Sequence, residues 1–585
     1  MNVLRAAVSL ALLAGVVGTA PASAAEPRPQ PPQICGNEIN SAERMRADVS
    51  ELAEKGIVRL DGRTITVHGD GAQWRQVDRR DQTYVTRFHS MAWLVLAVQQ
   101  GYPVVDLLLE REKALPDPGS TASSFDLKTT GWTEGAVRLR MGTVSCLYSW
   151  TGDQRLVPVM ERLVLASADP FRYRGLPLKK VHNHGTLSNI MLAEVAKVFS
   201  RDDWWQLALR RFTSDIAYVF SSCGVSAEQS SSYQYLNYQL WQRSLRLLED
   251  VGNHKGDFVR EMLGKAGLAA IQMTRPDGIL DAVGDGNERR QEQLNVDIDF
   301  DSADTRLWCP RRGWAANRSS WDDSMTHYVL RFGERVALHG HQDHGSATWF
   351  SQGVSVFTDR GLYDKARGSR YEWARSASAH NTFEPVGLDT SGEMDAIDLS
   401  ANRTDAYRLT WQEGKTSLVR DLRIPLDARY ITIDDTSPTD DTTLTDDSTV
   451  VDDTPVTVPL TTFQATDLGT SRRGQQWVQN WQLSPEWTLL DQGSVWDPIA
   501  FHSRTGLYLY GTCWSGRYLS PTAREVEAYP AWRTVVPATA FTCRQSGRLV
   551  RMDTLWAVTP VKGTLSWNRT TGAMTVTPDE PAPVP

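Results

Sequence analysis

The chain has 585 residues and a formal net charge of −8 at pH 7. Its mildly acidic balance, without a basic block or a charge difference between the two halves, excludes the electrostatic signature of a nucleic-acid-binding protein. The length exceeds what one hydrophobic core usually organises, so two or three domains are expected.

Residues 1–25 are predicted to be a secretory signal peptide. Arg5 supplies the positive start, an apolar run extends from Ala6 to about Val17, and Ala22–Ser23–Ala24 has the small-x-small pattern of a cleavage site. The alternative is a membrane anchor, but the run is short for the ~30 Å of hydrocarbon in a bilayer. We therefore expect a secreted, soluble protein with no membrane partner, in which residues 26–37 form a linker.

The 6 cysteines lack CxxC spacing, which argues against a cysteine zinc site. Export permits disulfides, and Cys513 and Cys543, on neighbouring predicted strands, are the expected pair. The 21 tryptophans are the compositional outlier. In an exported protein exposed tryptophans often stack on sugar rings, whereas packing in the core accounts for most of them.

Residues 38–312 have the helical period, in segments of roughly 11–19 residues bounded by Gly, Pro, Asp or Ser. Antiparallel helices with polar residues in the connecting loops indicate a helical barrel or toroid, and a superhelical repeat array is the alternative. Helices are expected over Ala42–Lys55, Phe88–Gln99, Val104–Ala114, Trp132–Trp150, Gln154–Ala166, Leu187–Phe199, Trp204–Ser221, Tyr233–Val251 and Phe258–Met273.

Residues 313–575 change to a period of two, which is typical of a large antiparallel sandwich. Strands are expected over Thr326–Phe332, Thr348–Thr358, Ala406–Thr410, Leu418–Pro425, Tyr430–Asp434, Trp487–Leu490, Gly506–Tyr510 and Arg548–Val558. The acidic run Asp434–Asp453 is expected to be a solvated loop or edge strand, with a calcium site as the alternative. Residues 576–585 are expected to be disordered.

The stretch from His339 to His344 contains three histidines and one aspartate. Asp359, Tyr363 and His380–Asn381 follow in a strongly patterned run. Histidine titrates near neutral pH and is the commonest metal ligand. This part of the chain therefore predicts acid–base or metal chemistry.

Two further motifs lie in the helical part. Asn183 and His184 stand just before an expected helix, where an amide and an imidazole can hold an anion, although residues of this kind are often only helix caps. The run Glu228–Tyr235 contains Tyr233 at the start of another expected helix. A tyrosine titrates near ~10, so neighbouring cations would have to lower its pKa before it could act as a base.

Taken in chain order, with the helical motifs before the β-strand motifs, they resemble those of the heparinase II/III-like polysaccharide lyases of the secreted, bacterial type. The most specific parts are His339-x-His341-x-Asp343, Asp359-x-Gly361-x-Tyr363 and Ala379–His380–Asn381–Thr382. The resemblance extends from about Arg140 to Asn381. It implies an α+β multidomain protein in which an incomplete (α/α) toroid is followed by an antiparallel β-sandwich, with the site in the cleft between them.

The resemblance also implies β-elimination on a uronic-acid glycan. Asn183 and His184 would neutralise the carboxylate, Tyr233 would protonate the departing O4 and can also take the C5 proton, and His339 would be the base when the C5 hydrogen lies on the opposite face. Tyr235 would replace Tyr233 if that side chain points away. Trp132, Arg140 and Arg375 are the remaining residues expected to contact substrate. The alternative for Arg140 is a buried structural ion pair, and the alternative for Trp132 is packing in the core.

His341, Asp359 and His380 match the metal-binding pattern of the same family. Two imidazoles and a carboxylate suit a divalent metal, with Zn²⁺ favoured, and a structural role is expected. The alternative is a metal-free hydrogen-bonded cluster. Asp343 and His344 would then brace the loop. No organic cofactor is expected.

The predicted partner is an anionic polysaccharide, and the protein is expected to be a monomer or a homodimer. The nearest basic cluster, Lys179–Lys180, is small, which favours a weakly sulfated or unsulfated uronate polymer such as hyaluronan, chondroitin, heparan sulfate, alginate or a bacterial exopolysaccharide. One rival is a glycoside hydrolase using a pair among Glu134, Glu228 and Asp285. A glycan-binding protein without catalysis is the other.

Overall fold

The structure is a computed structural model. It describes residues 33–67, 72–75, 82–119, 122–174, 182–250, 256–290, 299–321, 325–335, 338–388, 393–433, 456–492, 498–517, 519–568 and 573–578. The predicted signal peptide, Lys179–Lys180 and the acidic run Asp434–Asp453 lie outside these residues.

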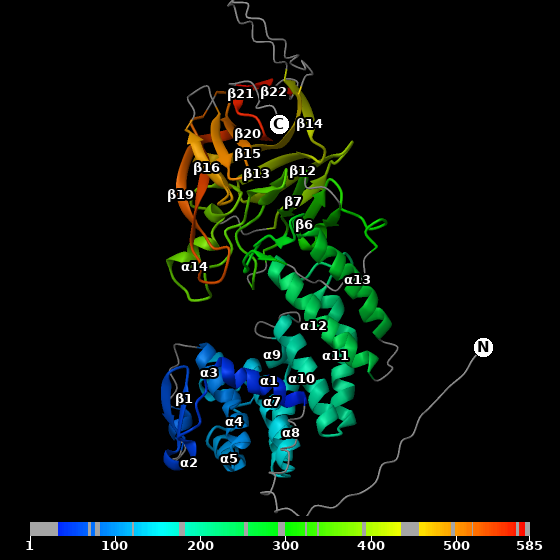
Figure 1. The fold of residues 1–585 in the computed structure, drawn as a ribbon, viewed down its shortest axis with the longest axis vertical. Helices are drawn as coiled ribbons and strands as arrows, with labels where there is room; N and C mark the ends of the chain where they lie inside the picture. Colours follow the sequence, from blue (N-terminus) through cyan, green and yellow to red (C-terminus); the bar gives the residue numbers. More distant parts are fainter. Residues whose placement is uncertain are drawn as a thin grey trace, which may run out of the picture.

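The described part of the chain divides into helices first and strands second (Figure 1). The helices are α1 (Gln33–Arg44), α2 (Leu52–Lys55), α3 (Gln82–Ser90), α4 (Trp93–Gln99), α5 (Val105–Ala114), α6 (Ser124–Thr130), α7 (Glu134–Thr151), α8 (Leu156–Ala168), α9 (Pro170–Arg174), α10 (Asn183–Val198), α11 (Asp202–Val219), α12 (Ser231–Glu249) and α13 (Gly256–Gln272). A small hairpin, β1 (Ile57–Leu60) with β2 (Arg63–Thr66), lies beside α2. No described helix is long and apolar enough to span a membrane.

The predictions of two continuous helices were wrong, because each is interrupted in the structure. The predicted helix Ala42–Lys55 is broken because α1 ends at Arg44 and Arg46 has a φ of 49°. The predicted helix Phe88–Gln99 is divided by Met91, whose φ is 60°. The freed backbone N–H of Ala92 donates to the Ser90 hydroxyl, so the break keeps its hydrogen bonding. Since α1 begins at Gln33, it also includes part of the expected linker.

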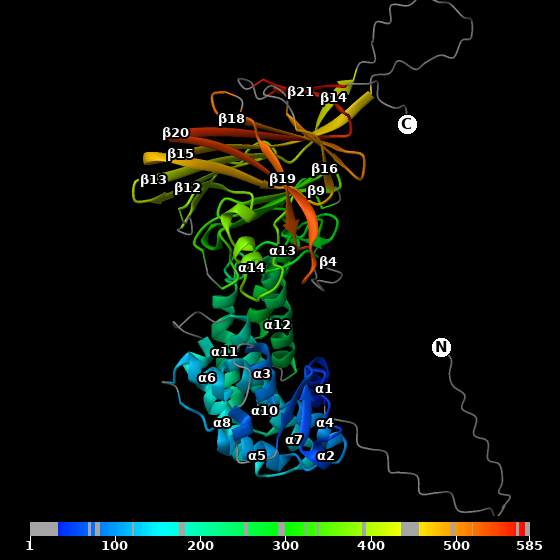
Figure 2. The ribbon, with the colours of Figure 1, turned by 90° about the vertical axis from the view of Figure 1, so that its left-hand side faces the viewer.

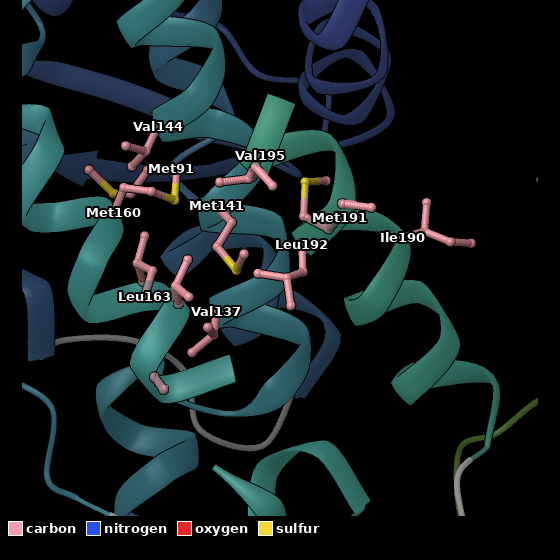
Figure 3. Close-up of a cluster of buried hydrophobic side chains, with 14 of the residues drawn as sticks. Met91, Val137, Met141, Val144, Met160, Leu163, Ile190, Met191, Leu192 and Val195 are labelled. Atoms are coloured by element: carbon pink, nitrogen blue, oxygen red, sulfur yellow. The ribbon is translucent and has the colours of Figure 1, made fainter. Parts of the chain in front are cut away.

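The helices pack around one apolar core. Met91, between α3 and α4, meets Met141 of α7, Met160 of α8 and several leucines and valines there (Figure 3). The flexible methionine side chains fill gaps between helices that cross at different angles. Fully buried tryptophans occur in both parts of the chain, which supports core packing as their main role: Trp74, Trp93, Trp132, Trp241, Trp314, Trp349, Trp477, Trp481 and Trp556.

Two large antiparallel sheets form the second part, and Figure 2 shows them above the helices. The smaller sheet has the order β5 (Leu307–Cys309), β6 (Trp314–Arg318), β7 (Thr326–Arg331), β8 (Ala347–Ser351) and β9 (Val354–Phe357). The larger sheet runs β11 (Asp395–Asp398), β12 (Thr404–Glu413), β13 (Thr416–Pro425), β15 (Val456–Gln482), β20 (Val536–Thr559), β18 (Tyr508–Trp514), β17 (Ile499–Ser503) and β16 (Trp487–Asp491). Additional strands are β10 (Phe383–Pro385), β14 (Arg429–Ile433), β19 (Thr522–Ala528), β21 (Gly563–Asn568) and β22 (Ala573–Pro578).

The core between the sheets is aromatic. The ring of Phe357 from the smaller sheet packs 5.0 Å from Trp481 and 5.1 Å from Trp556 of the larger one. The expected strand Thr348–Thr358 is a hairpin of β8 and β9, and the long strand β15 was not predicted. The expected disordered tail starts too early, because β22 continues to Pro578.

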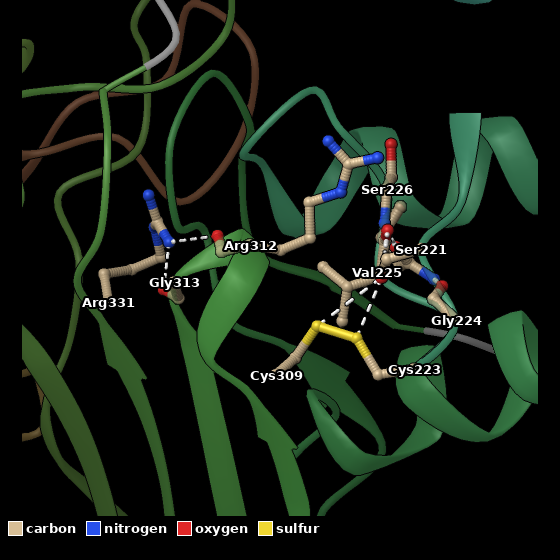
Figure 4. Close-up of a disulfide and its surroundings, with 10 residues drawn as sticks. Ser221, Cys223, Gly224, Val225, Ser226, Cys309, Arg312, Gly313 and Arg331 are labelled. Carbon is tan, nitrogen blue, oxygen red and sulfur yellow. Dashed lines mark hydrogen bonds between the residues drawn. A yellow bond between two sulfur atoms is a disulfide. The ribbon is translucent and has the colours of Figure 1, made fainter. Parts of the chain in front are cut away.

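A disulfide and an apolar cluster join the two parts. Cys223, in the loop after α11, is bonded to Cys309 at the end of β5 (Figure 4). Around it, Val225 and Met273 from the helical side pack with Trp314 from the sandwich. The predicted pair Cys513–Cys543 is confirmed as a disulfide between β18 and β20, and Cys35 is bonded to Cys146.

Candidate active site

Segments that are distant in the sequence meet where the helices join the sandwich. They are the start of α10 at Asn183, the loop between α11 and α12, and the loop between β7 and β8 that carries His339. A further segment, Asp281–Asn287, hydrogen-bonds to the second and third of these. The site is therefore assembled from both parts of the chain.

This close approach depends on Gly284. Its φ is 72°, a conformation that side-chain-bearing residues rarely adopt. A Cβ atom there would lie 2.6 Å from the Gln229 carbonyl oxygen and 2.7 Å from that of His339. The backbone N–H of Asp285 donates to the His339 carbonyl at 2.8 Å, and the Ser230 hydroxyl donates to the Asp285 carbonyl at 2.9 Å. Glycine thus lets three backbone segments touch.

Polar contacts link the helical side to the sandwich side through His339. The backbone N–H of Asn183 donates to Glu228 Oε1 at 2.8 Å, and Glu228 Oε2 lies 3.3 Å from His339 Nε2. His339 Nδ1 lies 2.9 Å from Asp285 Oδ2, and Asp285 Oδ1 lies 2.9 Å from His341 Nε2. Burial acts to raise the pKa of Asp285, but hydrogen bonds from the two histidines outweigh it and hold that pKa well below its usual range. His339 is thereby held between two carboxylates.

Tyr233, in the first turn of α12, packs directly on His339. The two rings are stacked, with 3.5 Å between their centroids and 12° between their planes. Lys365 Nζ, from the loop after β9, donates to the Tyr233 hydroxyl at 2.6 Å. Burial raises the pKa of Tyr233, while the Lys365 ammonium opposes that shift. The Tyr233 side chain is thus held by His339 on one face of its ring and by Lys365 at its hydroxyl oxygen.

His184 is the exposed member of the group, with 54% of its side chain accessible. Its backbone N–H donates to Asn183 Oδ1 at 2.9 Å, and its Nδ1 lies 3.0 Å from Glu134 Oε2. Ser188 also donates to Glu134, and Arg138 lies 3.1 Å from it. Burial acts to raise the pKa of Glu134, but Arg138, His184 and Ser188 together lower it to about 2. An ionised carboxylate therefore orients the exposed imidazole.

Two of the three carboxylates considered for a glycoside hydrolase lack the property that its general acid requires. Glu134, Glu228 and Asp285 each contact a histidine. The general acid of a glycosidase needs a raised pKa. The pKa of Glu134 is lowered to about 2 and that of Asp285 is also lowered, so neither holds a proton near neutral pH.

His341, Asp359 and His380 form a buried cluster whose ligand atoms lie within 4.8 Å of one another. His380 Nδ1 lies 2.9 Å from Asp359 Oδ2. His341 Nδ1 and His380 Nε2 are buried and, among the described residues, have no hydrogen-bond partner. A purely hydrogen-bonded cluster leaves these two nitrogens unsatisfied, whereas a metal ion would use such donors. The residues present can therefore hold a divalent metal.

Asp343 and His344 lie beside this cluster and are buried. Asp343 Oδ2 is 3.8 Å from the Arg331 guanidinium, and burial lowers the pKa of His344 to about 4. Both side chains lie inside the sandwich, where they can brace the loop that carries His339.

The prediction that Trp132 and Arg140 contact substrate needs correction, because both are 0% exposed. The Arg140 guanidinium donates to the carbonyls of His89 and Gly131 at 3.0 and 2.9 Å, and lies 4.6 Å from the Trp132 ring centre. It also forms an ion pair of 3.0 Å with buried Glu112. These residues hold the helical core together.

Tyr235 and Arg375 are also turned inward, with 8% and 9% of each residue exposed. Arg375 donates to Asp285 and, at 2.8 Å, to the Gly340 carbonyl. Its expected contact with substrate is therefore replaced by a contact that fixes Asp285 beside His339. Tyr235 lies on the buried face of α12, whereas Tyr233 faces His339, so the predicted fallback is not needed.

Sequence reasoning missed two parts of this arrangement. Asp285 and Glu228 were considered as hydrolase acids, and their contacts with the two ring nitrogens of His339 were not predicted. Their position just before a helix and inside a Gly-Asp-Gly turn was visible, but their common partner was not. Lys365 was missed altogether, because a lysine in a loop carries no sequence signal.

A large cavity lies away from these residues. It has a volume of about 1060 Å³ and lies on the sandwich side, with Arg275, Glu288, Trp487, Arg504 and Glu525 in its lining. None of the predicted catalytic residues lines it. This cavity therefore does not coincide with the ionisable side chains that converge around His339.

Comparisons with known proteins agree with this architecture. Residues 308–443 match the family model "Heparinase II/III-like, C-terminal". The chain is similar in structure to a heparinase III, with a TM-score of 0.63 and 13% identity over 91% of this chain and 86% of that chain. It is also similar to the heparan sulfate lyase HepC from Pedobacter heparinus, with a TM-score of 0.59 and 12% identity over 94% and 90% of the two chains. Among curated proteins, no significant match is found.

The predicted fold class is confirmed, because the match to heparinase III extends over both the helices and the sandwich. The structure thus combines a helical toroid with an antiparallel β-sandwich. The chain therefore has the fold of the solved heparinase III and HepC structures, and residues 308–443 match the heparinase II/III-like C-terminal domain.

Proposed function

We propose that the protein is a secreted polysaccharide lyase that cleaves a uronic-acid-containing glycan by β-elimination and leaves 4,5-unsaturated uronide ends. The observation that carries the proposal is the stack of Tyr233 on His339, next to Asn183 and His184 at the start of α10. This combination brings a proton-transfer group beside hydrogen-bond donors suited to a carboxylate.

The first requirement of the reaction is to lower the negative charge of the uronate carboxylate. Asn183 and His184 stand in the first turn of the 16-residue helix α10, whose N-terminus favours anions. Glu134 holds the imidazole of His184 in place. Donors placed in this way stabilise the enolate-like intermediate that forms when C5 loses its proton.

The second requirement is a base for C5–H and an acid for O4. We assign both roles to Tyr233: its phenolate takes the C5 proton, the C5–H electrons form the C4=C5 bond, and the C4–O4 bond breaks as the phenol returns that proton to O4. His339 can take the base role on the opposite face only after Glu228 or Asp285 releases a ring nitrogen. In the arrangement observed, Tyr233 is therefore the favoured base.

His341, Asp359 and His380 would hold a structural divalent metal, and their donor set favours Zn²⁺. A bound ion would fix the loop that carries His339, and none of the proton transfers requires it. The substrate proposed is an anionic uronate polymer of low sulfation. We propose that the protein acts without an organic cofactor, as a monomer or a homodimer.

The test is to express residues 26–585 and to follow the ultraviolet absorbance of the conjugated double bond with a panel of uronate polysaccharides. A rise with one polymer that disappears in Tyr233→Phe would support the proposal and identify the substrate. Release of reducing sugar without that absorbance would replace it with hydrolysis. No signal in either assay, together with binding to a glycan array, would favour a binding protein.

A further inference from the structure

We propose that Lys365 is a positioning residue for Tyr233: its ammonium group holds the phenol oxygen in place and favours the loss of its proton. The inference rests on the proposed lyase function. It means that Lys365, a residue of the sandwich part, influences the ionisation of Tyr233, a residue of helix α12.

The geometry places the ammonium at the oxygen and not over the ring. Lys365 Nζ is 2.6 Å from the Tyr233 hydroxyl but 5.4 Å from the ring centre. The ring face is occupied by His339. The phenol is therefore held by a stacking contact and by a hydrogen bond at its reactive atom.

The backbone that delivers Lys365 is tightly fixed. Gly361, four residues earlier, has a φ of 68°, and a Cβ there would lie 2.8 Å from the Tyr529 carbonyl oxygen and 3.0 Å from that of Gly286. The backbone N–H of Leu362 donates to the Gly286 carbonyl at 2.8 Å, and Asn287 donates to the Leu362 carbonyl at 2.9 Å. The Lys365 loop is thus anchored to the turn that carries Asp285.

The charged groups around Tyr233 oppose one another. Glu228, from the loop before α12, and Asp285, from the Gly284–Gly286 turn, disfavour the phenolate, whereas Lys365 favours it. His339 is the ring stacked on the phenol. Among the described residues, no carboxylate lies within ion-pair distance of Lys365, so its charge is directed at the tyrosine. Removing this cation leaves burial and two anions, which all favour the neutral phenol.

The experiment compares Lys365→Met and Lys365→Arg with the wild-type protein. For Lys365→Met, we expect the limb of the pH–rate profile that depends on Tyr233 to move to higher pH by about one unit, since a cation beside an acid lowers its pKa by about 1–3 units and exposure screens part of that effect. Below that limb the rate should fall about tenfold, because each unit is a factor of ten. Lys365→Arg should retain most of the profile. A lower rate in Lys365→Met with an unmoved profile would overturn the proposal.

A second measurement does not need a substrate. Ultraviolet difference titration of the wild-type protein against Tyr233→Phe isolates the phenolate of this one residue, and the same pair is measured in the Lys365→Met background. The Tyr233 titration should move to higher pH without Lys365, and an unchanged titration would overturn the inference. If it moves but no uronate polymer is cleaved, the lyase function fails and the coupling of Lys365 to Tyr233 stands.

Lys265→Met is the matched control. Lys265 is an exposed lysine on α13 that pairs with Glu261 at 2.8 Å. Its removal changes the net charge by the same amount, so it should leave the Tyr233 titration and the pH–rate profile unchanged. A shift of equal size in this control would mean that the net charge of the protein, and not Lys365 in particular, determines the pKa of Tyr233.

Discussion

Among the described residues, two of the clusters of charged side chains differ in their access to solvent. One surrounds Trp132 and contains Glu112 and Arg140, and the other contains Asp285 with His339. Both are built from ionisable groups with shifted pKa values: burial lowers the pKa of Arg140 to about 9, and that of Asp285 is lowered by its partners. They differ in access to solvent. The first is sealed among helices, whereas the second opens to the exposed His184 and the half-buried Tyr233.

The comparison shows that a shifted pKa does not by itself mark a functional site. A sealed cluster can only affect folding, because nothing from solvent reaches it. An open cluster can affect chemistry while adding little to stability. Substitutions in the two clusters should therefore separate activity from stability.

The largest effect is expected for Tyr233→Phe in the open cluster. Removing one hydroxyl eliminates the proposed proton transfer, so kcat should fall about 10²–10⁴-fold. Thermal unfolding followed by circular dichroism should hardly change, because the ring still stacks on His339. Unchanged turnover in this variant would remove Tyr233 from the reaction.

Arg140→Met should have the opposite profile. It leaves the carbonyls of His89 and Gly131 without a buried donor and weakens the pairing of Glu112, which should lower the free energy of unfolding by about 3–5 kcal/mol. The folded variant should keep its kcat/KM. Urea unfolding and initial rates measure the two quantities separately. A large loss of kcat/KM at unchanged stability would restore Arg140 as a substrate contact.

Glu134→Gln tests a residue of intermediate exposure, because the Glu134 side chain is only 13% accessible but contacts the exposed His184. The pKa of this carboxyl is lowered from 4.5 to about 2. A carboxyl group whose pKa is lowered by folding stabilises the folded state at pH values above its unfolded-state pKa. That stability is lost as the pH falls from about 4.5 towards 2. At neutral pH the contribution is up to about 3 kcal/mol. Acid unfolding of the variant should lack this pH dependence, and an identical acid transition would contradict the assigned interactions.

The smallest effect is expected from metal removal. If His341, Asp359 and His380 hold an ion, elemental analysis should find a divalent metal in the purified protein, and chelation should lower Tm by a shift equivalent to about 2–3 kcal/mol. His380→Ala should abolish metal content. Full thermal stability after chelation, with no metal found in the untreated protein, would favour the hydrogen-bonded cluster.

Much of the fold was predictable because local sequence determines it. The switch of apolar period from helical to alternating marks the change from toroid to sandwich, and it was visible without tertiary information. The break at Met91 was not, since a positive φ in a methionine is imposed by the surrounding packing. Strand β15 was missed because Pro459 and Gly469 interrupt its pattern, although pairing with β13 and β20 keeps it extended.

The site was predictable to a similar degree. The motifs that contain Asn183, Tyr233 and His339 do meet, although their catalytic roles remain predictions. The substrate contact predicted for Arg140 was wrong, and its alternative, a buried ion pair, is what the structure shows. The sequence around Arg140 does not reveal that α7 buries this face. Burial, and the approach of Lys365 to Tyr233, arise only when distant segments pack together.

The bond between Cys223 and Cys309 has one more consequence. It closes the chain into a ring with a sequence separation of 86, and Glu228, Tyr233 and Asp285 all lie within that ring. A protease that cuts once between these cysteines would leave both fragments covalently attached. The proposed catalytic tyrosine and the carboxylates that surround His339 would stay in one molecule after such a nick.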